Sequence, residues 1–316
     1  MSNKLNFVFC FDKNYTLQAQ ICIISLLDKV SEPINIFIIY SEVSFSNLST
    51  KITKHTMLNN LKIFQFREKQ SEFPNIANTH VSSATYYRFF ISHYIDASNK
   101  YLIYMDTDII CVNDPVSPLK KEIQGLDKSD FTIGAVVEYD LQDDQELFNR
   151  LELNSSYFNA GVMIINYKNW CNLDIGNKLL DHMVEIKEKV KFWDQDVLNS
   201  LFNGSFLRIS ESLNYSTSVK PNYRENLHNI EKNINFLHFS GKIKPWHLKG
   251  TDSKVSELYH RNYRKLDYGR YHLINRGKKM DFKNLLFLIL SLKIFHLDEV
   301  LNFLKQSFKL LSSNNQ

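Results

Sequence analysis

Along most of the chain, short apolar runs alternate with stretches in which apolar residues recur every three to four positions. The run Asn6–Phe11 (NFVFCF) is apolar on both faces, as is typical of a strand buried in a parallel sheet. A helix is predicted after it, from apolar residues on one face at Leu17, Ile21, Ile24 and Leu27. Further strands are predicted at Ile34–Tyr40, Leu61–Phe66, Lys100–Met105, Phe131–Val137 and Gly161–Asn166, and further helices at Ser82–Ile95, Leu173–Val190 and Asp194–Phe202. This order predicts an α/β fold with a Rossmann-like, mostly parallel sheet.

The chain divides into two parts by charge and composition. No internal repeat and no long linker rich in Ser, Gly or Pro interrupts residues 1–250, which are predicted to form one catalytic-sized domain. Residues 242–280 hold eleven Lys and Arg against three Asp and Glu, a net charge of +8 where the whole chain carries +4. Such asymmetry is typical of a surface that meets a partner. Residues 251–316 are predicted to be a basic, helical C-terminal extension.

From Asp281 onward, apolar residues recur at alternating steps of three and four and predict one continuous stripe on an amphipathic helix. The stripe consists of Phe287, Leu290, Ile294, Leu297, Leu301, Leu304, Phe308 and Leu311. This spacing fits a helix that packs on the catalytic domain or pairs in a short coiled coil, and it also fits a helix on a membrane surface. The basic segment before it favours an anionic membrane, because Lys and Arg near anionic lipid contribute about 1 kcal/mol each.

Composition narrows the classes of protein. Apolar residues make up 44% of the chain and only 9 residues are Gly, which excludes a disordered or a collagen-like protein. The net charge of +4 is too small to indicate nucleic-acid binding. The four cysteines lack CxxC spacing, which fits a reducing compartment. Because no export signal is visible and Leu285–Leu292 is the longest uncharged apolar run, a cytoplasmic protein is expected, either free or at the inner face of the cell membrane.

Two carboxylates directly follow a predicted central strand. Asp106 and Asp108 flank Thr107 after the strand Lys100–Met105, and ligands in open α/β sheets bind at the carboxyl ends of strands. Hard oxygen ligands so placed suit Mg²⁺ or Mn²⁺. A chance Asp-x-Asp is the alternative, because a chain of this size contains about one. A second copy, Asp194-Gln195-Asp196, opens a helical pattern, where an N-cap is the simpler explanation.

A histidine, a glycine and two lysines lie close together near residue 240. His238 follows the apolar pair Phe236-Leu237 and precedes Gly241, Lys242 and Lys244. A glycine that permits close backbone approach, with ammonium groups beside a histidine, would hold a diphosphate and its metal. The alternative is a surface turn with solvated lysines.

Three other positions carry weaker signals. The small residues in Asn159-Ala160-Gly161 would let a ligand approach the backbone, although an ordinary turn before a strand has the same sequence pattern. Asp12 and Asn14 follow the first strand, where a Rossmann-like sheet contacts the base or ribose of a nucleotide. The alternative is a simple Asx turn. Arg88 would clamp a phosphate, pair with Asp106, or extend from an aromatic face. Signatures of P-loop, dinucleotide-binding, zincin and serine-hydrolase sites are missing from the sequence.

In their order, these pieces resemble the family 8 glycosyltransferases, retaining enzymes that include bacterial lipooligosaccharide galactosyl- and glucosyltransferases. The resemblance runs from Asn6 to about His247 and rests on FVFCFDKNY (7–15), SSATYYRFF (82–90), YLIYMDTDII (101–110), YFNAGVMIIN (157–166), WDQDVLN (193–199) and HFSGKIKPWH (238–247). It implies a nucleotide-sugar-binding fold of the GT-A type with one Rossmann-like sheet.

The resemblance also implies roles for individual residues. Asp106, Asp108 and His238 would bind Mn²⁺, or Mg²⁺, at the diphosphate of a UDP-sugar. Donor binding is implied for Phe9, Cys10, Asp12, Asn14, Tyr15, Arg88, Asp106, Thr107, Asp108, Asn159, Ala160, Gly241 and Lys244. Catalytic positions at the donor sugar are implied for Asn159, Asp194 and Gln195. The chain carries Glu138 where the bacterial relatives carry Asp, and this longer carboxylate is expected to shift which sugar hydroxyl is read.

The implied activity is transfer of galactose or glucose from a UDP-sugar to a cell-envelope glycan or glycolipid, forming an α linkage. The metal and Lys244 would stabilise charge on the leaving phosphate. Gln195 would lie near the sugar C1, and because an amide is a poor nucleophile, attack of the acceptor from the face that UDP leaves is favoured. The alternatives are a protein or soluble acceptor, and a non-catalytic nucleotide-sugar-binding scaffold, which predicts decay of the metal-binding residues.

Overall fold

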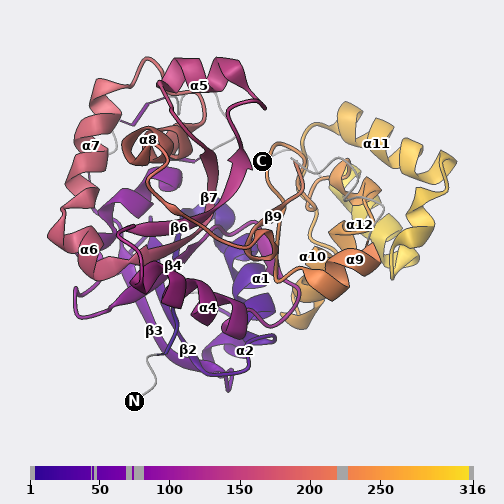
Figure 1. Ribbon diagram of the computed structural model, residues 1–316. Helices are drawn as coiled ribbons and strands as arrows, with labels where there is room; N and C mark the ends of the chain where they lie inside the picture. Colours follow the sequence, from indigo (N-terminus) through magenta and orange to yellow (C-terminus); the bar gives the residue numbers. More distant parts are fainter. Residues whose placement is uncertain are drawn as a thin grey trace.

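A seven-stranded sheet runs through the larger lobe of the molecule (Figure 1). The computed structural model describes residues 4–43, 45, 48–68, 73–74, 82–218 and 227–312. The strand order is β3-β2-β1-β4-β7-β6-β8, with pairs parallel except where β7 meets its neighbours β4 and β6. The strands are β1 (Asn6–Phe11), β2 (Ile34–Tyr40), β3 (Leu58–Gln65), β4 (Tyr101–Met105), β6 (Ile133–Tyr139), β7 (Tyr157–Asn166) and β8 (Leu207–Arg208). The predicted mostly parallel sheet is confirmed.

Apolar side chains on both faces of the sheet explain why the central strands read as uninterrupted apolar runs. In β1, Phe7, Phe9 and Phe11 point into one core, while Val8 and Cys10 point into the other. The first core is covered by α1 (Thr16–Leu27), α2 (Thr50–Thr53), α4 (Val116–Asp127) and α10 (Ser256–Lys265). The second is covered by η2 (Ser83–Phe90), α3 (Ile91–Tyr94), α6 (Tyr167–Asn172), α7 (Ile175–Glu185) and α8 (Trp193–Phe202).

Besides shifts of a few residues at the ends of other elements, three predictions differ from the structure. The segment Ser82–Ile95 is a 3₁₀ helix, η2, followed by the single turn α3, because its aromatic side chains are buried on several sides and not on one helical face. The helix predicted over Leu173–Val190 is shorter, because Asp174 adopts a left-handed conformation before α7 and the helix ends at Glu185. Strand β7 begins at Tyr157, so Asn159-Ala160-Gly161 lies within a strand and not in a turn before one.

A second, three-stranded sheet joins the end of β4 to the region near residue 238. It consists of β5 (Ile109–Cys111), β10 (Phe236–His238) and β9 (Tyr215–Ser216), in the order β5-β10-β9. Antiparallel pairing of β10 with β5 sets His238 opposite Ile109, one residue after Asp108. The remaining short helices are η1 (Lys13–Tyr15), α5 (Gln145–Leu151), η3 (Glu211–Leu213), α9 (Leu227–Asn233) and η5 (Gly250–Asp252).

The C-terminal helices form a smaller lobe beside the sheet (Figure 1). The continuous apolar stripe predicted from Asp281 is wrong, because the chain breaks into α11 (Lys278–Leu290), η6 (Lys293–His296) and α12 (Val300–Ser312), with Leu292 left-handed at the break. A third core forms between them from Leu248, Tyr271, Leu273, Leu285, Leu288, Ile294, Leu297 and Phe303. Of the predicted stripe, Ile294 and Leu297 are buried, whereas Phe287, Leu290, Leu301 and Phe308 are exposed. Among the described residues, no helix is long and apolar enough to cross a membrane.

Candidate active site

A cavity of about 360 Å³ opens at the carboxyl end of β1 and β4, where the two sheets meet. Most of the residues singled out from the sequence line it: Cys10, Tyr15, Arg88, Asp106, Thr107, Asp108, Asn159, Ala160, Asp194, Gln195, His238, Gly241 and Lys244. Phe9, Asp12 and Asn14 are not among its lining residues. The Phe9 side chain is buried in the core, and Asp12 caps η1 by accepting a hydrogen bond from the backbone N–H of Asn14 at 2.9 Å.

Asp106 is held in place by two donors. Its Oδ1 accepts hydrogen bonds from the Arg88 guanidinium at 2.8 Å and from the Tyr104 hydroxyl at 2.7 Å. Arg88 is buried and also pairs through Nε with Asp194 Oδ2 at 2.9 Å. Burial opposes the charge on Arg88, but Asp106 and Asp194 outweigh it and raise the pKa of the guanidinium. Arg88 therefore stays charged and links the first carboxylate to α8.

Asp108 lies between a histidine and a lysine. Its Oδ1 is 3.2 Å from His238 Nε2, and its Oδ2 accepts from Lys244 Nζ, which also donates to the carbonyl of Phe239 at 2.8 Å. Burial alone would raise the pKa of Asp108, but the charges on Lys244 and His238 hold it well below its ordinary value. Asp108 is therefore a carboxylate across the neutral pH range.

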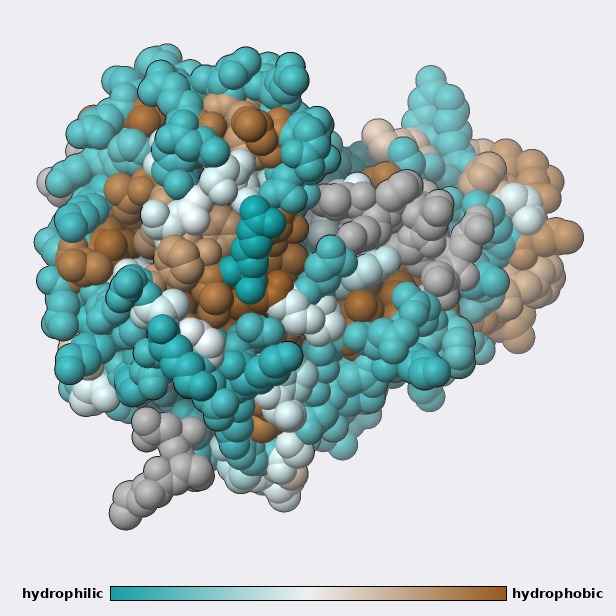
Figure 2. Space-filling model, in the orientation of Figure 1, coloured by the Kyte–Doolittle hydropathy of each residue, from teal (hydrophilic) through white to brown (hydrophobic). Residues whose placement is uncertain are grey.

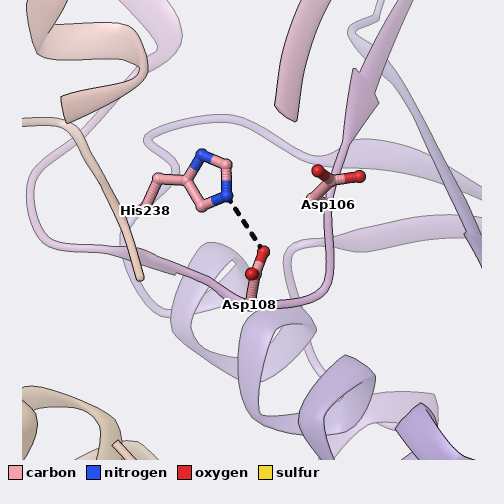
Figure 3. A group of neighbouring side chains, drawn as sticks. All are labelled: Asp106, Asp108 and His238. Carbon is pink, nitrogen blue, oxygen red and sulfur yellow. Dashed lines mark ion pairs between the residues drawn. The ribbon is translucent and has the colours of Figure 1, made fainter. Parts of the chain in front are cut away.

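The geometry fits a divalent cation. Asp106, Asp108 and His238 each offer one ligand atom, and these atoms lie within 4.8 Å of one another. Figure 3 shows the three side chains pointing toward a common space, with the Asp108–His238 ion pair drawn. Two carboxylate oxygens and one imidazole nitrogen form a donor set that suits Mn²⁺.

The loop after β10 brings Lys244 back to this space. Gly241 has a φ of +77°, a left-handed conformation that favours glycine at the turn. Further on, a Cβ at Gly250 would lie 1.9 Å from the carbonyl oxygen of Lys244, so the loop closes only with glycine there. His260 of α10 approaches the carbonyl of Pro245 at 3.1 Å and ties this loop to the C-terminal lobe.

The opposite wall of the cavity carries the residues implied at the donor sugar. Gln195 accepts from the backbone N–H of Ala160 at 3.0 Å and donates to Glu138 Oε2 at 2.8 Å. Asn159 donates to the same carboxylate oxygen at 3.1 Å. Burial raises the pKa of Glu138, while these two hydrogen bonds lower it. Glu138 therefore orients both amides that face the cavity.

Two residues here were missed by the sequence analysis, Tyr104 and Asn214. Asn214 is buried and bridges Asn159 Oδ1, at 2.8 Å, and His238 Nδ1, at 2.9 Å. It stands alone in the sequence between η3 and β9, without a neighbouring motif. No local pattern signals such a residue, because its contacts lie in distant segments.

The class of protein follows from the fold, an α/β sheet with three side chains at its carboxyl edge that could hold a metal ion. The galactosyltransferase LgtC, in complex with donor and acceptor sugar analogs, superposes with a TM-score of 0.70 at 20% identity, covering 87% of this chain and 99% of that one. The glycosyltransferase GlyE of Streptococcus pneumoniae, in its apo form, gives a TM-score of 0.60 over 84% of this chain and 62% of that one, again at 20% identity. The chain therefore has the GT-A fold that its sequence predicted.

Sequence comparison then gives the family. The model of glycosyl transferase family 8 matches residues 6–250, and the chain belongs to this family of retaining UDP-hexose transferases. Similar proteins include a lipopolysaccharide 1,2-glucosyltransferase of Escherichia coli K12, 29% identical over 78% of this chain and 74% of that protein. A lipopolysaccharide 1,3-galactosyltransferase of Salmonella typhimurium is 24% identical over 79% and 75%. The resemblance read from the motifs is confirmed at the level of family and enzyme class.

Proposed function

We propose that this chain transfers galactose or glucose from a UDP-sugar to a cell-envelope glycan or glycolipid, with retention and with Mn²⁺ at Asp106, Asp108 and His238. The observation that carries the proposal is the convergence of these three side chains with Lys244 in one cavity. The relatives named as lipopolysaccharide glucosyl- and galactosyltransferases support the acceptor class. A scaffold without activity would not keep a complete metal-ligand set.

Different residues of the cavity would bind the nucleoside diphosphate and the sugar of the donor. When the bond between the sugar C1 and the β-phosphate oxygen breaks, its electron pair goes to the phosphate. Lys244, already beside Asp108, is placed to stabilise that charge. A bound Mn²⁺ would supply Lewis-acid stabilisation of the same group. Asn159, Asp194 and Gln195 would hold the sugar, and Cys10, Tyr15 and Thr107 the nucleotide, because all of them line the cavity.

Retention follows from attack on the face that UDP leaves. The Gln195 carbonyl oxygen accepts from the Ala160 N–H and its nitrogen donates to Glu138, so the amide is held as a positioning group. The acceptor hydroxyl would form the new bond to C1 and pass its proton to the departing β-phosphate oxygen. This step needs no covalent intermediate on the protein.

The proposal is tested by donor hydrolysis without acceptor. Purified protein with Mn²⁺ is offered UDP-galactose, UDP-glucose and UDP-N-acetylglucosamine, and UDP release is measured. Release from one hexose donor, abolished by EDTA and restored by Mn²⁺, is expected. No release from any donor, with intact UDP binding, would favour the scaffold. A panel of glycolipid, protein and soluble acceptors then separates the proposed acceptor from the alternatives.

We also propose that residues 251–316 hold the enzyme at the inner, cytoplasmic face of the membrane. Apolar side chains on α11 and just after it are exposed: Met280, Phe282, Leu286, Phe287, Ile289, Leu290, Leu292 and Phe295. Figure 2 shows this apolar surface on the smaller lobe. Lys278, Lys279 and Lys283 are exposed on the same helix, which suits an anionic surface. Part of the basic segment is already neutralised, by the pairs Arg261–Asp298, Arg264–Glu257, Lys265–Asp28 and Arg270–Glu299.

Co-sedimentation with anionic vesicles tests this attachment. Truncation near Met280 would uncover the third core and could unfold the lobe. The test therefore uses a double variant at two exposed residues, Phe287→Glu with Leu290→Glu. The unaltered protein is expected to sediment and the double variant to stay in solution. Leu141→Glu, at a position on the larger lobe that is about as exposed as Phe287, is the control and should sediment. Equal sedimentation of all three proteins would rule out this face.

A further inference from the structure

A chain of side-chain amides runs from the proposed metal ligand His238 to the wall at the donor sugar. Asn214 lies at its centre and is 2% exposed. Its amide contacts His238 on one side and Asn159 on the other. Asn159 in turn contacts Glu138, which holds Gln195. Two regions with different partners, the metal ligands and the sugar wall, are thus joined by hydrogen bonds.

The direction of each amide can be assigned from a backbone donor. The N–H of Gly161 lies 2.9 Å from Asn159 Oδ1, and a backbone N–H can only donate, so this atom is the oxygen of Asn159. Asn159 Nδ2 then faces the Glu138 carboxylate, which accepts. Because Asn159 Oδ1 cannot donate, Asn214 must turn its nitrogen toward it, and its own oxygen toward His238.

This orientation determines the hydrogen on His238. An amide oxygen accepts only, so His238 Nδ1 must carry a hydrogen that it donates to Asn214. The other ring nitrogen, Nε2, is left to face Asp108. Metal-binding histidines generally donate their second ring N–H to a protein acceptor, which fixes the ring and raises its basicity as a ligand.

Packing leaves the imidazole little freedom to take another position. A Cβ at Gly161 would lie 2.4 Å from His238 Cε1 and 2.9 Å from Asn159 Oδ1. The backbone of β7 therefore approaches the ring as closely as glycine allows. The glycine that the sequence analysis assigned to ligand approach instead makes room for His238.

We propose that Asn214 is a positioning residue that presents Nε2 of His238 to the cation and couples the metal ligands to Asn159 and Gln195. The inference rests on the proposed function, since the cation is the one named there. Asn214 touches neither the donor nor the cation in this assignment. It acts through its two neighbours.

Two variants separate the two contacts. Asn214→Ala removes both, whereas Asn214→Asp keeps an acceptor for His238 Nδ1–H but cannot donate to Asn159. Mn²⁺ affinity in the presence of UDP is measured by electron paramagnetic resonance, and the His238 ring N–H is followed by ¹⁵N-edited NMR in the metal-free protein. Asn262→Ala, at a buried asparagine of α10 that bonds the Leu258 carbonyl, is the control.

Asn214→Ala is expected to weaken Mn²⁺ binding about 10- to 100-fold and to lose the protected Nδ1–H signal. Asn214→Asp is expected to recover most of the affinity and the signal, while kcat stays low because Asn159 loses the hydrogen bond from Asn214. Unchanged affinity and an unchanged ring signal in Asn214→Ala would overturn the proposal. If Asn214→Ala does not fold, Asn214→Asp decides it, and an unaltered kcat in that variant would overturn the proposal. If unaltered protein binds no Mn²⁺, the proposed function fails, whereas the ring signal still reports on Asn214.

Discussion

The chain contains the pattern Asp-x-Asp twice, and the two copies have different surroundings. Asp106 and Asp108 follow strand β4 and face a cavity. Asp196 lies in the first turn of α8, fully buried, and accepts from Arg150, Tyr157 and the backbone N–H groups of Lys191 and Phe192. Asp106 and Asp108 have protein partners too, but they face the cavity of the proposed metal site, whereas all the partners of Asp196 lie inside the fold. The same pattern thus lines the proposed metal site in one place and forms buried structural contacts in the other.

The N-cap explanation of the second copy is wrong in detail. The N-cap of α8 is Phe192, and Asp196 reaches back from inside the helix to two N–H groups before it. Asp194 combines features of both copies, because it lines the cavity and also forms a buried ion pair with Arg88. A carboxylate at a helix start therefore needs its tertiary partners before its function can be assigned.

The largest effect is expected from Asp196→Asn. It leaves Arg150 without its buried charged partner, since Glu146 at 3.7 Å is exposed, and breaking a buried ion pair on one side costs about 3–5 kcal/mol. The free energy of unfolding, measured in urea, should fall by this amount. Mn²⁺ affinity per folded molecule should be unchanged. A stable variant that loses Mn²⁺ would reverse the comparison.

Asp108→Asn should show the opposite behaviour. Without one proposed metal ligand and the partner of Lys244, kcat is expected to fall about 10²–10³-fold. Thermal unfolding should shift less than in Asp196→Asn, because Asp108 faces the cavity, where water replaces the lost contact. UDP release and Mn²⁺ binding are the measurements. Near-normal turnover would remove Asp108 from the metal site.

Asp194 gives a pH-dependent test. Burial raises its pKa from 3.8 to about 6, although Arg88 opposes the shift. The folded chain thus holds this proton more tightly than the unfolded chain, so the stabilising contribution is present below about pH 4 and is lost as pH rises through 6. It amounts to about 3 kcal/mol at 1.36 kcal/mol per pH unit. Urea unfolding of Asp194→Asn between pH 4 and 7 should lack this slope, and an unchanged slope would assign it elsewhere.

The smallest effects are expected from Gln195→Ala and Asp12→Ala, which should change different kinetic constants. Gln195→Ala should lower kcat about tenfold, or about 1.4 kcal/mol, with UDP affinity retained, since the amide belongs to the cavity wall proposed for the donor sugar. Asp12→Ala should raise the donor KM instead, because it loosens the η1 turn beside Tyr15. Steady-state kinetics with varied UDP-sugar separates the two. Exchanged effects would contradict both assignments.

Local patterns determined the elements of the sheet. Strands β1 and β2 have the bounds read from the sequence, because strands buried on both faces are uninterrupted apolar runs. The carboxyl edge, with Asp106 and Asp108, followed from the same pattern. His238 and Lys244 were also singled out from the local sequence, the family motifs implied their roles, and both residues line the cavity.

Tertiary structure alone decided which distant residues meet. Pairing of β10 with β5 brings His238 beside Asp108, and the amide of Asn214 joins it to Asn159. The same holds for the C-terminal helices, where a spacing that fits one long helix is broken after Leu290 and folded around Leu285 and Phe303. The physical reason is range: hydrophobic periodicity records which face of an element is buried, whereas hydrogen-bond partners and helix breaks depend on segments that meet only when the chain has folded.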